Sequence, residues 1–277
     1  MDPQTITAVY SVSEFYLPYF HISVRSLPST MPVVVSLVNG ASPQDLPSNV
    51  QCVRGSMRQD NFSKAQTLNA ALRQVTTPWV MIADADLVFP VKFFEYLDAN
   101  CDAWQVRRFF VARCDPALTE GILAGRQSYE RYRPYQGRRT WPRPSLPARG
   151  VRWVVNRLFP SLEVAYGRDV IDFSEIYGAN NPCIMSRDLL LALRGYDERY
   201  VGWGGEDDDL TARGDRAGAV NVRVPLVVGH LHHPAVTDFP SYRSGSNRHD
   251  IVAASGVTAA NSGVDPTGPR EDVPSCP

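Results

Sequence analysis

The stretch PWVMIADADLVFP, residues 78–90, joins an apolar run to a pair of carboxylates. Residues 79–83 are all apolar, as expected of a strand that is covered on both faces of a parallel sheet. Asp84 and Asp86 follow at the end of this run, and side chains two positions apart on an extended chain share one face. The stretch therefore predicts a buried strand that delivers two carboxylates to a single ligand.

Strands and helices are expected to alternate around this stretch. Apolar, β-branched runs predict strands over residues 5–11, 31–40, 183–185 and within 219–234. Helical spacing of apolar side chains predicts helices over residues 16–27, 61–75 and 187–193. This alternation predicts an α/β fold with a mixed, mostly parallel sheet flanked by helices, whose ligands bind beyond the carboxyl ends of the strands.

The bulk composition is that of a globular protein with a substantial core. The chain has 277 residues, 44% of them hydrophobic, and a net charge of -1, so the global charge favours neither a nucleic-acid nor a membrane partner. We expect one domain over residues 1–239 and a polar, flexible tail over residues 240–277, which are rich in Ser, Gly, Asn and Pro.

The cysteines and the apolar runs predict a compartment. The five cysteines are widely spaced and form no C-x-x-C pair, which argues against a zinc site and against a disulfide framework. The N-terminus lacks the pattern of a signal peptide, and no apolar run approaches the length of about 18 residues that a membrane helix needs. We therefore expect a cytoplasmic protein.

Two motifs predict a metal site. A D-x-D such as Asp84-Ala85-Asp86 most often lies in a surface turn, but its place after a buried strand favours Mg2+ or Mn2+ holding a diphosphate. The segment GHLHHP, residues 229–234, holds three histidines beside a predicted strand end. His230 and His232 share a face if this strand stays extended, whereas His230 and His233 converge if the chain turns. Imidazole ligands favour Mn2+ over Mg2+.

The segment YVGWGGEDDDL, residues 200–210, places four adjacent carboxylates directly behind two glycines. One interpretation is structural, because an acidic first turn is favoured by the dipole of a helix. The other is functional, because adjacent carboxylates repel one another and a Gly-Gly pair loses backbone entropy on ordering. The segment alone does not decide between them.

Taken together, these motifs resemble the GT-A glycosyltransferases. The resemblance is closest to the β-1,4-galactosyltransferase family and to the bacterial polymerases that build chondroitin-like chains. It covers about residues 55–235, and its most specific part is GANNPCIMSRDLLLALRGYDERYVGWGGEDDDL, residues 178–210. FSKA at residues 62–65 is similar to the F-N-R-A segment of the family, with Lys64 in place of the arginine near the nucleotide.

The resemblance implies a role for each matching residue. Asp207 would be the catalytic base, which takes the proton of an acceptor hydroxyl in a single in-line displacement with inversion. The acceptor-binding residues would be Trp203, Gly204, Gly205, Glu206 and Asp208. The nucleotide-sugar-binding residues would be Asn39, Lys64, Asp84, Ala85 and Asp86. The metal, Mn2+ or Mg2+, would be held by Asp86, His230 and His233, and the donor would be a UDP-sugar.

Residues 101–160 interrupt the α/β pattern with a basic segment. They hold twelve arginines against four acidic residues, a net charge of +8, interleaved with tyrosine and tryptophan. One interpretation is a solvated lid over the site. The other is a surface for an anionic acceptor such as an acidic polysaccharide, a phosphorylated lipid-linked sugar or nucleic acid, including hydroxymethylated bases of phage DNA.

Two rival functions remain open at this stage. A nucleotidyltransferase also binds a nucleotide and a metal over an α/β sheet, but it would have no need of the GWGGEDDD segment. A catalytically inactive module that binds sugars or nucleic acid belongs to another class, and no residue that catalysis requires is missing from this sequence.

Overall fold

The computed structural model of the chain describes residues 1–38, 41–54, 63–90, 93–97, 102–126, 176–200, 202, 204–234 and 264. The strands are β1 (Ile6–Val12), β2 (Val33–Leu37), β3 (Val50–Arg54), β4 (Trp79–Ile82), β5 (Leu87–Val88), β6 (Gln105–Arg113), β7 (Ile176–Ser186) and β8 (Val220–His230). The α-helices are α1 (Leu17–Arg25), α2 (Lys64–Leu72), α3 (Pro116–Leu123), α6 (Arg187–Ala192) and α7 (Glu206–Arg216). Two 3-10 helices, η1 (Pro3–Thr5) and η2 (Glu14–Tyr16), flank β1.

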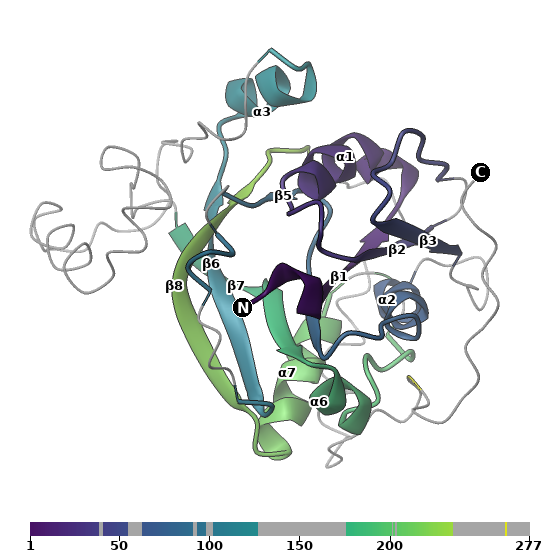
Figure 1. Cartoon of the computed structure of the whole chain (residues 1–277), viewed down its shortest axis with the longest axis vertical. Helices are drawn as coiled ribbons and strands as arrows, with labels where there is room; N and C mark the ends of the chain where they lie inside the picture. The colour runs from purple at the N-terminus through teal and green to yellow at the C-terminus, as the bar shows by residue number, and fades with distance from the viewer. Residues whose placement is uncertain are drawn as a thin grey trace, which may run out of the picture.

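The strands form one mixed sheet in the order β3-β2-β1-β4-β7-β6-β8-β5. The pairs from β3 to β4 are parallel, β7 runs antiparallel to both β4 and β6, and β8 is parallel to β6. The long strands β6 and β8 curve along one side of the molecule (Figure 1). The predicted α/β fold with a mixed, mostly parallel sheet and flanking helices is confirmed.

Helices cover both faces of the sheet, which explains the unbroken apolar runs in its strands. Ala8 and Tyr10 of β1 pack in one core with Phe20 of α1. Val9, which points to the opposite face, packs in a second core with Leu68 of α2. Apolar side chains of α6 and α7 complete the second core. The central strands therefore need apolar residues at successive positions rather than at alternate ones.

The helix starts are set by local capping. The hydroxyl of Ser63 accepts the backbone N–H of Gln66, so α2 begins at Lys64 and is shorter than the helix predicted over residues 61–75. Gly205 caps α7 with a φ of 90°, a left-handed conformation that favours glycine. The four carboxylates of residues 206–209 occupy the first turn of α7, which confirms the structural interpretation of the acidic segment without excluding the functional one.

Part of the predicted basic insertion belongs to the sheet. The prediction missed β3 and β6, and β6 together with α3 lies inside residues 101–160. Arg107 and Arg108 of β6 are buried, so these two arginines are not part of a solvated basic surface. Residues 127–160, with the remaining arginines of the segment apart from Arg113 and Arg126, lie outside the described residues.

The expectation about the cysteines also needs correction. Cys52 on β3 is disulfide-bonded, whereas Cys114 and Cys183 are free and buried. The spacing of cysteines along the chain does not reveal pairs that the fold brings together. In the predicted flexible tail, Val264 is buried, and its backbone N–H donates to the carbonyl of Arg194 at 2.8 Å. Within the described ranges, no helix is long and apolar enough to cross a membrane.

Candidate active site

The start of α2 is fastened to the loop that precedes α7. The hydroxyl of Ser63 donates to the carbonyl of Tyr200 at 2.7 Å, and the backbone N–H of Lys64 donates to the carbonyl of Gly202 at 3.2 Å. These contacts place the Lys64 side chain against the acidic first turn of α7. Two segments more than a hundred residues apart in the sequence thus form one site.

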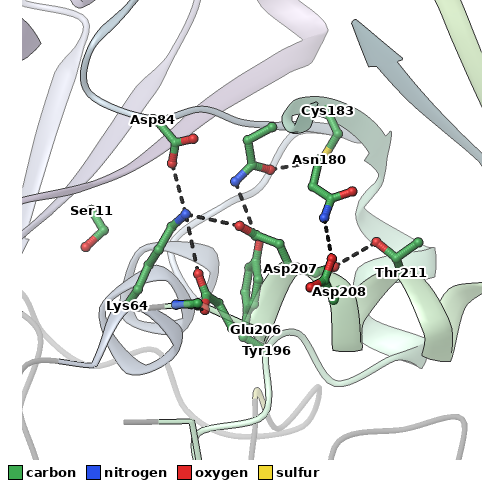
Figure 2. A network of polar contacts seen from close by, with 12 residues as sticks. Ser11, Lys64, Asp84, Asn180, Cys183, Tyr196, Glu206, Asp207, Asp208 and Thr211 are labelled. Carbon is green, nitrogen blue, oxygen red and sulfur yellow. Dashed lines mark hydrogen bonds and ion pairs between the residues drawn. The ribbon is translucent and has the colours of Figure 1, made fainter. Parts of the chain in front are cut away.

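Lys64 connects the D-x-D to the acidic segment. Its buried ammonium lies 3.0 Å from Asp84 Oδ1, 3.2 Å from Asp207 Oδ2 and 3.5 Å from Glu206 Oε1 (Figure 2). Burial lowers the pKa of Lys64, but the three carboxylates outweigh burial and hold this pKa well above its ordinary value. Lys64 therefore remains a cation shared by both halves of the site.

Three side chains donate to the carboxylate of Asp207. Oδ1 accepts the Tyr196 hydroxyl at 3.0 Å and the Asn181 Nδ2 at 3.2 Å, while Oδ2 faces Lys64. Burial, followed by the charge of Asp207, raises the pKa of Tyr196 well above its ordinary value, so its hydroxyl stays protonated and donates. The Asp207 side chain is 20% exposed, which leaves it open to a ligand.

Asp208 is held by a second, separate set of contacts. Its Oδ1 accepts the Asn180 Nδ2 at 2.8 Å, and Asn180 Oδ1 accepts Arg108 Nη1 at 3.1 Å. Arg108 Nη2 also donates to Thr211 Oγ1 at 2.6 Å, and the Thr211 hydroxyl donates to the carbonyl of Asp207 at 2.7 Å. Arg108 thus fixes β7 and α7 behind the two carboxylates.

Glu206 and the glycines shape the loop itself. Glu206 is 1% exposed, and its Oε2 accepts the backbone N–H of Gly204 at 2.7 Å. Gly204 has a φ of 103°, a conformation that favours glycine, and a Cβ there would meet no atom within 4 Å. Gly204 is therefore required by its backbone conformation and leaves open space beside it. Trp203 and Asn39 lie outside the described residues.

A separate group of side chains has the composition of a metal site. His233 Nε2 lies 3.0 Å and His230 Nε2 3.5 Å from Asp86 Oδ2, and one ligand atom of each residue lies within 4.8 Å of the others. The chain turns after β8, so His230 and His233 converge as one of the two sequence alternatives predicted. His232 lies outside this group, and its backbone N–H donates to Thr119 Oγ1.

The environment of Asp86 fits a bound cation. Its Oδ1 is buried and has no hydrogen-bond partner among the described residues. Burial raises the pKa of Asp86, but His230 and His233 outweigh burial and lower it below its ordinary value. One carboxylate with two imidazoles is a ligand set that suits Mn2+ better than Mg2+. These residues would hold such an ion.

The two carboxylates of the D-x-D face different side chains. Ala85 is buried between the two aspartates, Asp84 faces Lys64, and Asp86 faces the histidines. The two carboxylates thus have different protein partners, and their binding of a single ligand stays a prediction. A two-residue spacing fixes a shared face only on a regular strand, and β4 ends at Ile82, before the first aspartate.

Four residues of the site were not predicted from the sequence: Tyr196, Asn180, Asn181 and Arg108. Each contacts a carboxylate of α7 directly or through one neighbour, yet none forms a motif with it. The only signal was that Asn180, Asn181 and Tyr196 lie within the segment that resembles the family, residues 178–210. Arg108 was counted with the basic segment, although it is buried.

Known proteins share part of the sequence and the fold of this chain. Residues 171–235 match the family model described as the N-terminal domain of galactosyltransferase. No curated protein sequence matches the chain significantly.

Among solved structures, Staphylococcus aureus TarS 1-349 with UDP-GlcNAc is 12% identical, with a TM-score of 0.55 over 90% of this chain and 65% of that one. The catalytic domain of Drosophila β1,4-galactosyltransferase 7 with xylobiose is 11% identical, with a TM-score of 0.48 over 91% and 82%. Mycobacterium tuberculosis glucosyl-3-phosphoglycerate synthase with Mn2+, UDP-glucose and phosphoglyceric acid is 18% identical, with a TM-score of 0.45 over 83% and 73%.

These findings confirm the resemblance predicted from the sequence. The fold is shared with TarS, and the family match includes the segment that carries Asn180, Asn181, Asp207 and the two convergent histidines. The chain therefore carries a galactosyltransferase-family segment on a glycosyltransferase fold of the GT-A class.

Proposed function

We propose that the protein is a metal-dependent, inverting glycosyltransferase that moves a sugar from a UDP-sugar to an acceptor hydroxyl. The observation that carries this proposal is the placement of Asp207. This carboxylate is partly exposed and lies 3.2 Å from Lys64, which also contacts Asp84. Asp86, two positions further along, belongs to the group with His230 and His233. The proposed base and the proposed metal ligands are thus linked through Lys64 and the D-x-D.

In this mechanism each side of the site has its own residues. Asp86, His230 and His233 would hold Mn2+, which when bound neutralises charge on the departing nucleoside diphosphate. Asn39, Lys64, Asp84 and Ala85 are proposed to bind the nucleotide-sugar. A UDP-sugar is proposed as donor because TarS, which shares the fold, binds UDP-GlcNAc.

The acceptor side is proposed to include Trp203, Gly204, Gly205, Glu206 and Asp208 around the base. The acceptor oxygen attacks the anomeric carbon, and its proton passes to Asp207. The bond between this carbon and the phosphate oxygen breaks on the opposite face, which inverts the configuration. Because Glu206 is buried and contacts Gly204 and Lys64, it shapes the acceptor loop from behind.

Hydrolysis of UDP-sugars in the absence of an acceptor tests this proposal. We expect the purified protein to release UDP from at least one of UDP-glucose, UDP-galactose and UDP-GlcNAc with Mn2+ but not with EDTA. Asp207→Asn keeps the size of the side chain but removes the base, so turnover should fall by roughly 10^2 to 10^4.

Two outcomes would contradict the proposal. Absence of hydrolysis and of Mn2+-dependent UDP binding in the wild-type protein would exclude a UDP-sugar transferase. Normal turnover of Asp207→Asn would leave the enzyme class intact but remove Asp207 as its base. A melting temperature equal to that of the wild type would show that the variant is folded.

A further inference from the structure

The hydrogen bonds to Asp207 are distributed unevenly between its two oxygens. An ionised carboxylate accepts about four hydrogen bonds in all, two on each oxygen. Tyr196 and Asn181 both donate to Oδ1, at 3.0 and 3.2 Å, and Lys64 donates to Oδ2 at 3.2 Å. Oδ1 is thus fully used by these two donors, and the position left for a ligand is on Oδ2.

We propose that Tyr196 and Asn181 are positioning residues that hold Oδ1 of Asp207, so that the acceptor hydroxyl delivers its proton to Oδ2. This inference rests on the proposed function, since it assigns atoms within the same transfer step. The acceptor O–H bond breaks as its oxygen bonds to the anomeric carbon. The proton moves to Oδ2, and the electron pair of the broken sugar–phosphate bond leaves with the nucleoside diphosphate.

Both donors are themselves held rigidly, as a positioning role requires. The backbone N–H of Tyr196 donates to Asn69 Oδ1 at 2.9 Å, and Asn69 Nδ2 donates to the Tyr196 carbonyl at 2.8 Å. Asn181 is buried, and its Oδ1 accepts the thiol of Cys183 at 3.7 Å, while its Nδ2 donates to Asp207.

The two side chains that donate to Oδ1 of Asp207 come from different parts of the fold. Tyr196 lies between α6 and α7 and is held by α2, whereas Asn181 lies on β7. Rotation of the Asp207 carboxylate would break both contacts at once. A carboxylate held in this way presents one defined oxygen to the acceptor, which avoids reorganisation during the reaction.

Tyr196→Phe tests the inference, and Tyr200→Phe is its matched control. Tyr200 is also buried, but its hydroxyl has no hydrogen-bond partner among the described residues. The probe is hydrolysis of the UDP-sugar that the wild-type protein hydrolyses fastest with Mn2+. Because a hydrogen bond to a charged group is lost, we expect Tyr196→Phe to lower kcat roughly tenfold and leave the KM of the UDP-sugar within about twofold.

The direction of the change in kcat distinguishes a lost orientation of Asp207 from a change in its basicity. Loss of a donor makes a carboxylate more basic, which by itself favours proton transfer, so a lower kcat indicates lost orientation. Asn181→Ala should also lower kcat, again with little change in KM. Tyr200→Phe should keep the kcat of the wild type.

Several outcomes would overturn the inference. Equal kcat values for Tyr196→Phe and the wild type would do so, as would a higher kcat, or a loss that Tyr200→Phe shares. If Tyr196→Phe does not fold, as judged from its melting temperature, Asn181→Ala decides in its place. If Asp207→Asn retains normal hydrolysis, the proposed base is wrong and this inference falls with it. If Tyr196→Phe and Asn181→Ala keep the kcat of the wild type while Asp207→Asn loses activity, the proposed function stands without the inference.

Discussion

At the scale of single residues, neighbouring carboxylates in this chain have different partners. Asp84 faces Lys64, and Asp86 faces two histidines. On α7, Asp207 is bound by Tyr196, while Asp208 is bound by an asparagine that Arg108 orients. Identity and spacing alone would make these carboxylates equivalent. Their surroundings make them different.

Asp86→Ala should abolish Mn2+-dependent binding of UDP, because the described group of possible metal ligands loses its carboxylate and one negative charge. His232→Ala is the matched control, since His232 lies outside the described group of possible ligands. Isothermal titration calorimetry with UDP, in the presence and absence of Mn2+, measures the UDP affinity of both variants. Equal UDP affinity of Asp86→Ala and the wild type in Mn2+ would remove Asp86 from the site.

At the scale of elements, the sequence predicted the strands and helices that have a strong apolar pattern. The predicted strands over residues 5–11 and 31–40 correspond to β1 and β2. Both strands are covered on both faces, so almost every side chain in them is buried. The single strand expected within residues 78–90 is divided into β4 and β5. β5 pairs with the far end of β8, and this pairing brings Asp86 to His230.

The sequence failed where a buried element carries charge. QVRRFFVAR, residues 105–113, resembles a basic surface segment, but it forms the inner strand β6. Arg108 is buried there because Asn180, Thr211 and Asn221 satisfy its donors, and these partners lie about 70 to 110 positions away in the chain. The contacts of Asp207 with Tyr196 and Asn181, 11 and 26 positions away in the chain, were also not predicted, because the fold and not a local motif brings these side chains together. The D-x-D and histidines could be predicted because each is a local motif.

Arg108→Ala should lower the melting temperature strongly, because it leaves the buried partners of Arg108 unsatisfied. With a loss of about 3 kcal/mol in the free energy of unfolding, the melting temperature should fall by roughly 6 to 12 °C. Arg126→Ala is the matched control, since its pair with Glu120 is largely exposed and contributes about 0 to 1 kcal/mol. Thermal denaturation compares the two, and equal shifts would show that Arg108 does not hold β7, β8 and α7 together.

At the scale of the whole molecule, positive charge is concentrated in one segment of a chain whose other residues carry a net negative charge. The net charge of the chain is -1, yet residues 127–160 hold eight arginines and one acidic residue. The two buried arginines of β6, Arg107 and Arg108, lie outside this basic segment. An anionic acceptor is therefore still proposed for residues 127–160, by their composition alone.

Acceptor use should depend on salt if this segment binds an anion. Each ionic contact with a polyanion releases counterions, so the apparent affinity for a sulfated or phosphorylated glycan should fall steeply between about 50 and 200 mM salt. Charge reversal at Arg138 and Arg139 should weaken acceptor binding and leave UDP binding unchanged. Transfer rates measured across salt concentrations check this, and a flat response would favour a neutral glycan acceptor.

The position of the Lys64 ammonium has a consequence for how donor binding and acceptor binding affect each other. Because it is shared between Asp84 and Asp207, any ligand that draws it toward one carboxylate changes the field at the other. Such sharing is a thermodynamic linkage, and linkage is reciprocal. If a bound donor changes the affinity for the acceptor by some factor, a bound acceptor changes the affinity for the donor by the same factor. Two substrates that never touch Lys64 at the same moment would still communicate through its charge.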